Sequence, residues 1–419
     1  MHRPSAYPPD LTRYVEAHWP TSARLALPSA LLEEALSAAF QASLTVEETR
    51  STRFRLLLTA PEQLPETGVP NHGVLRLKFD HSRPLNADEL RRLAPAVPFE
   101  TALIAAHPEQ GKLRIWGVAH SGPAWLAPTW GGRSAVPNWS YDPIIHVTAP
   151  GQLAVRCAGQ LIGALERGLL VDAALDVFDS AWLPTLFAHE REVIQAEHAA
   201  LQANVDSPTS VEHSLIGKVA QQMLRRAIQL VRGSRHGGLL LIVDARGAAR
   251  APLNGLRLKY TLVQDEPSHR YRTLLFQILE AVAATSSKDS VGWLDFASNE
   301  SAQFELLEQA VFEQSRVLAN LTAIDGALVL DKRFSVLGFG AEVSAELPTP
   351  KNVWRALDTE GHTLQPEDIE NVGTRHRAAY RFVNDHPNGL AVVISQDGGV
   401  SFVASRDGQV VFWEQSVSP

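Results

Sequence analysis

The chain has 419 residues, of which 45% are hydrophobic and 20% charged, values typical of a globular protein with two or three domains. Its 38 basic and 46 acidic residues give a net charge of −8, so nothing marks it as a general nucleic-acid binder. The single cysteine, Cys157, excludes an internal disulfide framework. No apolar run approaches the ~20 residues of a membrane span, and no signal-peptide core follows the N-terminus. We therefore expect a cytoplasmic protein without a membrane tether.

Residues 1–152 are rich in proline and hold most of the tryptophans. Residues 33–40 read as a helix, and the alternation of apolar and polar residues at 74–79 and 113–118 predicts short strands. We expect a compact α+β domain with long loops, with Cys157 as a small buried hydrophobe just beyond it. The tryptophans that cluster among glycines and prolines are expected to serve packing; they are Trp116, Trp125, Trp130 and Trp139.

Residues 153–207 read as a helical connector. The most polar part is 187–198, and Asp206-Ser207-Pro208 marks the boundary to the next domain. His189-Glu190 invites comparison with the zinc motif H-E-x-x-H, but Val193 stands where the second histidine belongs. We therefore interpret 187–198 as a solvated linker helix.

Residues 208–419 alternate between helical and extended patterns, which predicts an α/β domain with a buried mixed sheet covered by helices on both faces. The polar segment from Lys351 to Glu370 reads as a loop, and we expect it to cover the site described next. Helices are expected at 215–231, 271–284, 303–319 and 375–384, and strands at 239–243, 327–330, 336–339, 390–394, 400–404 and 410–413.

Asp325-Gly326-Ala327 lies between a predicted helix and a predicted strand. Asp-Gly is common in ordinary turns. Here, however, the aspartate falls at the edge of the sheet, where α/β proteins place their ligands. Its carboxylate is a candidate for binding a metal ion or a sugar hydroxyl.

Gly373-Thr374-Arg375-His376-Arg377-Ala378-Ala379 reads as a turn that opens a helix. A basic triplet at a helix start is usually solvated. The free N–H groups at such a start also bind phosphate, and arginines add charge-assisted contacts. Because residues two apart do not share a helix face, Arg375 and Arg377 reach one ligand only if it lies over the helix end.

These two motifs resemble those of the diadenylate cyclase family, which condenses two ATP into cyclic di-AMP. Two further segments, 236–243 and 393–399, are similar to the family's Gly-rich strand and its late Ser-Glu-Glu segment. The resemblance covers roughly residues 208–419. It implies that two such domains meet face to face in a homo-oligomer, because each holds one ATP.

The resemblance also implies a set of site residues. Asp325, Arg375, His376 and Arg377 would be catalytic, and Asp325, Gln396 and Asp397 would hold Mg²⁺ or Mn²⁺. ATP would contact the Gly-rich strand, the aspartate turn, the helix start and the late serine: Gly238, Leu239, Leu240, Gly326, Ala327, Gly373, Thr374, Arg375, His376, Arg377 and Ser395.

The late segment departs from the family pattern, since it reads Ser395-Gln396-Asp397 instead of Ser-Glu-Glu. Gln396 is neutral and a poorer ligand for a hard divalent cation, with Asp397 as a substitute one position later. This departure keeps open a catalytically degenerate protein that senses ATP or a cyclic dinucleotide. A different nucleotidyl-transfer product is a second alternative, because adenine selection rests on backbone contacts that a sequence does not display.

Residues 114–122, with the tryptophan-rich sequence after them, resemble the N-terminal sensor-type domain, DACNV, that is attached to some diadenylate cyclases. This resemblance implies a regulatory domain at residues 1–152 with a ligand of its own. The sequence does not identify that ligand.

Overall fold

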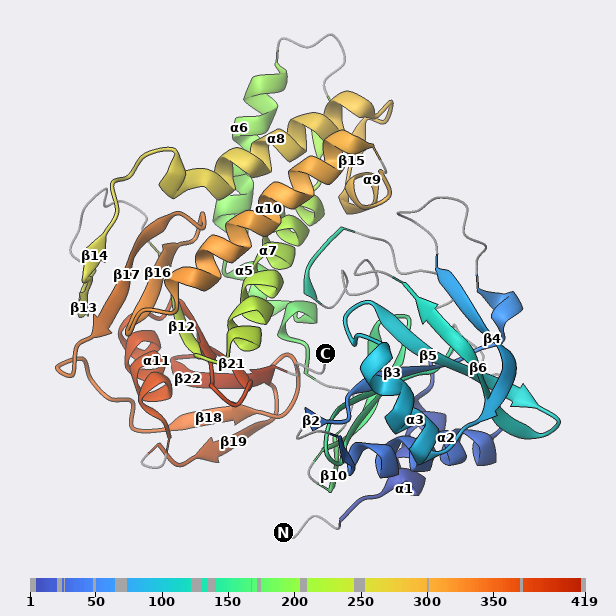
Figure 1. The fold of residues 1–419 in the computed structure, drawn as a ribbon. Coiled ribbons are helices and arrows are strands. Elements are labelled where there is room, and N and C mark those ends of the chain that lie inside the picture. The colour runs from blue at the N-terminus through green and yellow to red at the C-terminus, as the bar shows by residue number, and fades with distance from the viewer. Residues whose placement is uncertain are drawn as a thin grey trace. The chain divides into compact units, whose positions relative to one another are not determined.

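The computed structural model describes residues 5–20, 25, 27–47, 50–64, 74–121, 130–133, 141–166, 168–171, 175–203, 209–244, 253–299, 301–369 and 372–415. The chain divides into two compact units (Figure 1). The first comprises residues 1–129, 134–174 and 418–419, and the second comprises residues 130–133 and 175–417. Within the described residues, no helix has both the length and the apolar character that crossing a bilayer requires.

The first unit is built on an eight-stranded sheet in the order β10-β9-β8-β7-β3-β5-β6-β4. Every neighbouring pair is antiparallel except β3 and β5. The strands are β3 (Phe54–Leu58), β4 (Leu75–Pro84), β5 (Ala102–Glu109), β6 (Lys112–His120), β7 (Ile144–Ala149), β8 (Gln152–Cys157), β9 (Gln160–Glu166) and β10 (Leu169–Val171).

Helices cover one face of this sheet. Leu11 of α1 (Pro8–His18) and Leu36 of α2 (Ser29–Ser43) are fully buried in one apolar cluster with Phe54, Leu56 and Ile145 of the strands. The remaining elements are α3 (Ala87–Leu93), the 3-10 turns η1 (Pro61–Gln63) and η2 (Ala94–Ala96), and the short pair β1 (Val46–Glu47) and β2 (Arg50–Ser51). The α+β interpretation of the N-terminal region agrees with these elements.

The helical interpretation of residues 153–171 is wrong, because the segment forms β8, β9 and β10. Ala158 and Gly159 both have positive φ, 50° and 79°, as a tight hairpin turn requires. Leu153 and Val155 alternate into the buried cluster, as does Cys157, where burial raises the pKa of the thiol to about 11. The N-terminal unit therefore extends to residue 174.

Trp116 and Trp130 are the two clustered tryptophans within the described residues. Trp116 is buried and its Nε1 donates a hydrogen bond to the Thr59 carbonyl at 2.8 Å, in agreement with a packing role. Trp125 and Trp139 lie outside the described residues, as does the predicted boundary at 206–208.

The second unit contains a ten-stranded mixed sheet with the path β13-β17-β16-β12-β20-β21-β22-β18-β19, and β14 pairs with β17. The pairs β12–β16 and β18–β22 are parallel. The strands are β12 (Gly238–Val243), β13 (Leu256–Arg257), β14 (Tyr260–Thr261), β16 (Ala327–Asp331), β17 (Val336–Val343), β18 (Val353–Ala356), β19 (Leu364–Glu367), β20 (Leu390–Ile394), β21 (Val400–Arg406) and β22 (Gln409–Gln415).

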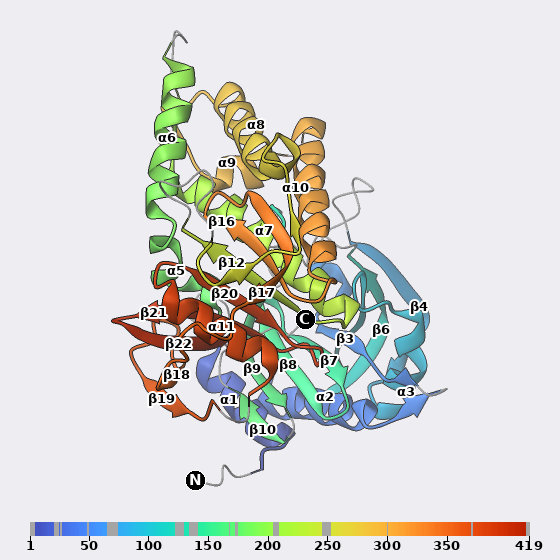
Figure 2. The same cartoon turned by 90° about the vertical axis from the view of Figure 1, so that its left-hand side faces the viewer.

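Helices cover both faces of this sheet, as the sequence predicts (Figures 1 and 2). Leu240 and Ile242 face α7 (His213–Ser234), α8 (Arg270–Thr285) and α10 (Ala302–Leu321). Leu239 and Leu241 face α11 (Thr374–Asp385) on the other side. The unit also contains η5 (Val177–Asp179), α5 (Trp182–Thr185), α6 (Ala188–Gln202), η6 (Pro267–His269), α9 (Trp293–Ala297), and the short parallel pair β11 (Ser210–Val211) and β15 (Ser290–Val291).

Two local expectations fail in the second unit. Helix α6 is not a solvated linker, since Ile194 is buried and Glu190 accepts a hydrogen bond from Arg333 Nε at 2.7 Å. The segment predicted as a loop from Lys351 forms the hairpin β18–β19, because Val353 and Ala356 are buried and β18 pairs with β22.

Leu241 lies on the face of the sheet that α11 covers and is 0% exposed, so Leu241→Ala should strongly destabilise the second unit. We expect the free energy of unfolding to fall by about 2–5 kcal/mol. Leu306→Ala is the matched control, since Leu306 is 67% exposed, and it should change stability by less than about 0.5 kcal/mol. Urea unfolding followed by circular dichroism measures both. Equal losses in the two variants would contradict this packing.

Candidate functional site

Four strand ends and one helix start meet at one edge of the second sheet. The register aligns Gly238 of β12 with Ile394 of β20, and Ala327 of β16 with Ala341 of β17. Strands β12 and β16 therefore begin where β17 and β20 end. This is the amino edge of the parallel pair and not the carboxyl edge that α/β proteins usually use for ligands. The site residues are therefore brought together by the antiparallel pairs β12–β20 and β16–β17, and not by the order of parallel strands.

A cavity of about 560 Å³ opens at this edge. The predicted site residues that line it are Leu239, Asp325, Gly326, Gly373, Thr374, Arg375, His376, Ser395 and Gln396. The described residues that line it without having been predicted as site residues are Ala341, Glu342, Val343, Ala378 and Val393. The hairpin β18–β19 contributes none of the described lining residues, so it does not cover the cavity as expected.

Asp325 projects from a turn that only glycine can complete. Gly326 has φ +115°, and a Cβ there would lie 2.5 Å from the carbonyl carbon of Gly340 on β17. The turn carries the chain from the end of α10 into β16. The Asp325 side chain is exposed at the cavity and makes no hydrogen bond or ion pair with another residue of the described chain. Its carboxylate is therefore available to a ligand.

Helix α11 presents an uncapped N-terminus to the same cavity. Its first helical hydrogen bond runs from Arg377 N to Gly373 O at 3.1 Å, so the N–H groups of Thr374, Arg375 and His376 have no helical acceptor. Gly373 offers no capping side chain, and the first turn holds no acidic residue. Free N–H groups and the positive end of the helix dipole favour an anion here.

The two arginines of the motif lie differently. Arg375 lines the cavity, and its Nη2 donates a hydrogen bond to the His236 carbonyl at 3.2 Å. Its guanidinium lies against the backbone of Gly237, since a Cβ there would be 2.8 Å from Nη1. Arg377 is exposed and is not among the cavity residues. The two-residue spacing turns it away along the helix.

His376 also lines the cavity, where its side chain is partly buried. Burial lowers the pKa of its imidazole, while Glu414 and Asp397 act to raise it. The Nε2 atom lies 3.4 Å from Ser401 Oγ of β21. A neutral imidazole near pH 7 contributes a hydrogen bond to a ligand and not a full charge.

Among the remaining predicted residues, strand alternation and the turn after β20 decide which line the cavity and which do not. Leu239 faces the cavity, whereas Leu240 points to the opposite face and Ala327 is buried in the core. Gly238 is buried against Thr322: a Cβ added at Gly238 would lie 3.1 Å from the Cβ of Thr322. Asp397 is not among the cavity residues, and its Oδ1 accepts a hydrogen bond from Gly399 N at 3.3 Å.

The donor groups suit a divalent cation only in part. Asp325 supplies one carboxylate and Gln396 one amide oxygen at the cavity. Glu342 also lines the cavity, but it forms an ion pair with Arg257, and this pair lowers the pKa of the Glu342 carboxyl. Its Oε1 also lies 3.5 Å from Lys259 Nζ. Among the described residues no three His, Cys, Asp or Glu side chains form a metal cage. Mg²⁺ commonly binds through one or two carboxylates plus substrate phosphates, and this set fits that mode.

Sequence reasoning missed Glu342 and Val343 because it ended β17 at 339, whereas the strand runs to Val343. The alternation that continues through Ala341, Glu342 and Val343 was the available signal. The longer strand brings a carboxylate to the cavity beside Gly326.

The close approach at Gly326 predicts that Gly326→Ala lowers the free energy of unfolding by about 1–3 kcal/mol, through backbone strain. Gly233→Ala is the matched control, because Gly233 lies in α7 with no atom within 4 Å of its Cβ position. That variant should gain about 0.4–1 kcal/mol. Urea unfolding of both variants measures the change in the free energy of unfolding. Changes of the same sign in the two variants would contradict the turn geometry.

Residues 22–120 match a family model described as a probable sensor domain, DACNV. The match lies within the first unit and contains none of the cavity residues. It confirms the expectation of a DACNV-type sensor domain in the N-terminal region. No curated protein and no solved structure matches the chain.

Proposed function

We propose that the second unit is a diadenylate cyclase domain that condenses two ATP into cyclic di-AMP and pyrophosphate, under the control of the N-terminal sensor domain. The observation that carries the proposal is the convergence of Asp325, Arg375 and the free N-terminus of α11 on one cavity. The DACNV match supports it, because this type of sensor domain is associated with diadenylate cyclases.

The cavity has the size and polarity for one nucleotide. Its volume of about 560 Å³ falls within the ~300–1,000 Å³ typical of ligand pockets. The triphosphate would accept hydrogen bonds from the free N–H groups of α11, from the Thr374 and Ser395 hydroxyls and from Arg375. Leu239 and Val393 offer the base an apolar surface.

Mg²⁺ or Mn²⁺ would be held by Asp325 and Gln396 together with phosphate oxygens. When bound, the ion lowers the pKa of the ribose 3′-OH and neutralises charge on the α-phosphate. Asp325 would orient the hydroxyl for in-line attack. The N-terminus of α11 and Arg375 would stabilise the charge that develops on the leaving pyrophosphate.

One cavity of this size holds only one of the two reacting nucleotides. The second ATP would come from the cavity of a second copy, placed face to face about a two-fold axis. In that arrangement the 3′-OH of the ATP on one copy attacks the α-phosphorus of the ATP on the other, the hydroxyl proton is lost to solvent and pyrophosphate leaves. A second, reciprocal step closes the ring and releases the second pyrophosphate. Positioning supplies much of the acceleration.

A second candidate function is nucleotide sensing without turnover. The specific observation in its favour is that Gln396, a neutral residue, lines the cavity, whereas Asp397 does not. Such a protein would bind ATP or a cyclic dinucleotide with the same helix start. Restoring a carboxylate with Gln396→Glu separates the two, because a silent protein that gains activity is a degenerate cyclase.

The arginine geometry predicts different effects for a matched pair of variants. Arg375→Ala should weaken binding of α,β-methylene ATP by at least about tenfold, the loss expected for a charge-assisted phosphate contact. Arg377→Ala should change affinity less than about twofold, because Arg377 is exposed outside the cavity. Calorimetric titration measures both. Equal losses would show that Arg377 reaches the phosphates as well.

The carboxylate geometry predicts that Asp325→Asn abolishes formation of cyclic di-AMP while α,β-methylene ATP still binds within a few-fold of the wild-type affinity. Asp397→Asn is the control at a carboxylate that does not line the cavity, and it should retain most activity. Product chromatography beside calorimetry checks both variants. Full turnover by Asp325→Asn would remove the role proposed for this residue.

A further inference from the structure

The last turn of helix α7 contacts the turn that carries the cavity residues Ser395 and Gln396. Arg232 Nε donates a hydrogen bond to the Gly398 carbonyl at 2.9 Å, and Arg232 Nη1 donates to Gln229 Oε1 at 2.8 Å. Gly398 belongs to a tight turn in which Gly398 N bonds to Ser395 O at 3.1 Å and Ser395 N bonds to Gly399 O at 2.8 Å. Ser395 lines the cavity, so one guanidinium holds a cavity turn at a set position on α7.

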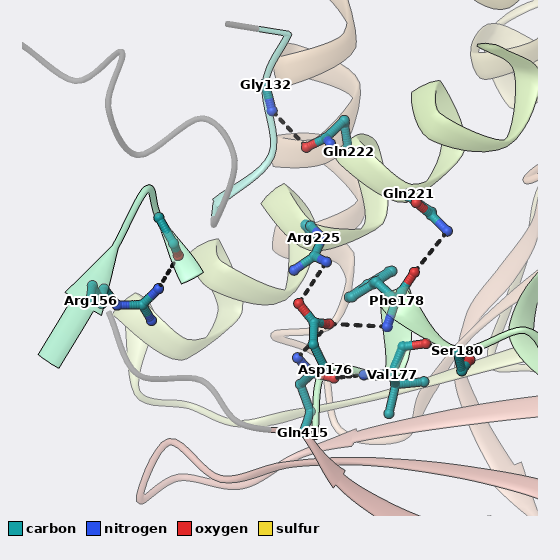
Figure 3. A network of polar contacts seen from close by, with 11 residues as sticks. Gly132, Arg156, Asp176, Val177, Phe178, Ser180, Gln221, Gln222, Arg225 and Gln415 are labelled. Atoms are coloured by element: carbon teal, nitrogen blue, oxygen red, sulfur yellow. Dashed lines mark hydrogen bonds and ion pairs between the residues drawn. The ribbon is translucent and has the colours of Figure 1, made fainter. Parts of the chain in front are cut away.

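Two segments far apart in the sequence attach to the middle of the same helix (Figure 3). Gly132 N donates to Gln222 Oε1 at 2.9 Å. Asp176 Oδ2 accepts from Arg225 Nη2 at 2.7 Å, and Gln221 Nε2 donates to the Phe178 carbonyl at 3.2 Å. Both segments directly follow chain that belongs to the first unit. The second unit therefore receives its two incoming segments on neighbouring residues of α7.

The segment 130–133 is firmly held in the second unit. Arg133 is 7% exposed, and its Nε forms an ion pair with Glu308 Oε2 of α10 at 3.0 Å. Its backbone N–H donates to Glu308 Oε1 at 2.8 Å, and Nη1 donates to the Phe296 carbonyl at 3.2 Å. Breaking these contacts would leave a buried charge without its partner, which is costly.

The segment that begins at 175 also joins α7 to the sheet. Asp176 Oδ1 accepts from Gln415 Nε2 at 2.9 Å, and Gln415 Oε1 accepts from Val177 N at 2.7 Å, as Figure 3 shows. Gln415 is the last residue of β22. Asp176 thus connects the incoming chain, α7 and β22 at one point.

We propose that α7 transmits the state of the N-terminal unit to the cavity, with Arg232 as the positioning residue at its end. While both segments are docked, α7 holds the turn 395–399 in the form that binds a nucleotide. When the segment 130–133 leaves Gln222 and Glu308, α7 shifts, the Arg232–Gly398 contact loosens and nucleotide affinity falls. The physical link is one continuous helix of about 33 Å. This inference rests on the nucleotide binding proposed above.

The test is a double-mutant cycle in the full chain. Arg232→Ala and Gln222→Ala should each lower the affinity for α,β-methylene ATP by about fivefold or more, the lower end of typical coupling between sites. The double variant should bind no more weakly than Arg232→Ala alone, because both act through one contact. Glu308→Gln, which removes the ion pair of Arg133, should act in the same direction. Gln303→Ala, at an exposed position of α10, is the control and should change nothing.

Hydrogen exchange without nucleotide provides the second readout. Arg232→Ala and Gln222→Ala should both raise exchange at 395–399 while the melting temperature stays within a few degrees of wild type, and Arg232→Lys should restore part of the protection. Unchanged exchange in Gln222→Ala, or affinity losses that multiply in the double variant, would overturn the proposal. If the wild type binds no nucleotide, the proposed function fails, and the exchange data still decide whether α7 controls the turn.

Discussion

The site depends on antiparallel pairing on either side of the parallel strands β12 and β16. Because β20 and β17 run the other way, their ends lie where β12 and β16 begin, and a single edge collects four strand ends. Helix α11 starts above this edge, with its side chains packed on the same face as Leu239. A one-residue slip of β12 would turn Leu239 away from the cavity and bring Leu240 to it. The register therefore determines which side chains reach a ligand.

The cavity is lined by groups of both signs, which we call its anionic and cationic sides. The cationic side is the uncapped start of α11 with Arg375, and the anionic side is the carboxylate of Asp325. Burial lowers the pKa of His376, which favours its neutral form, and Glu342 is engaged by Arg257 and Lys259. A polyphosphate that brings a divalent cation complements both sides at once. This complementarity, rather than any single motif residue, is what supports a nucleotide as ligand.

Sequence reasoning predicted the longer elements of the second unit well because clear turns bound them. The predicted strand 390–394 and helix 375–384 differ from β20 and α11 by at most one residue per end. It failed at 153–171, where residues with high helix propensity, such as the leucines and alanines of β8 and β9, are held in strands by cross-strand pairing. In the site, motif residues next to element ends were found. Side-chain direction was not predictable, which is why Arg377 and Leu240 were expected at the cavity. Glu342 was missed because the predicted strand ended at residue 339.

The full chain incubated with ATP and Mg²⁺ or Mn²⁺, with products resolved by chromatography and mass, tests the central claim most directly. The account predicts cyclic di-AMP and pyrophosphate, with a rate per chain that rises with protein concentration because two cavities must meet. A protein that binds α,β-methylene ATP at this cavity but forms no dinucleotide, even after Gln396→Glu, would contradict the cyclase and leave a nucleotide sensor.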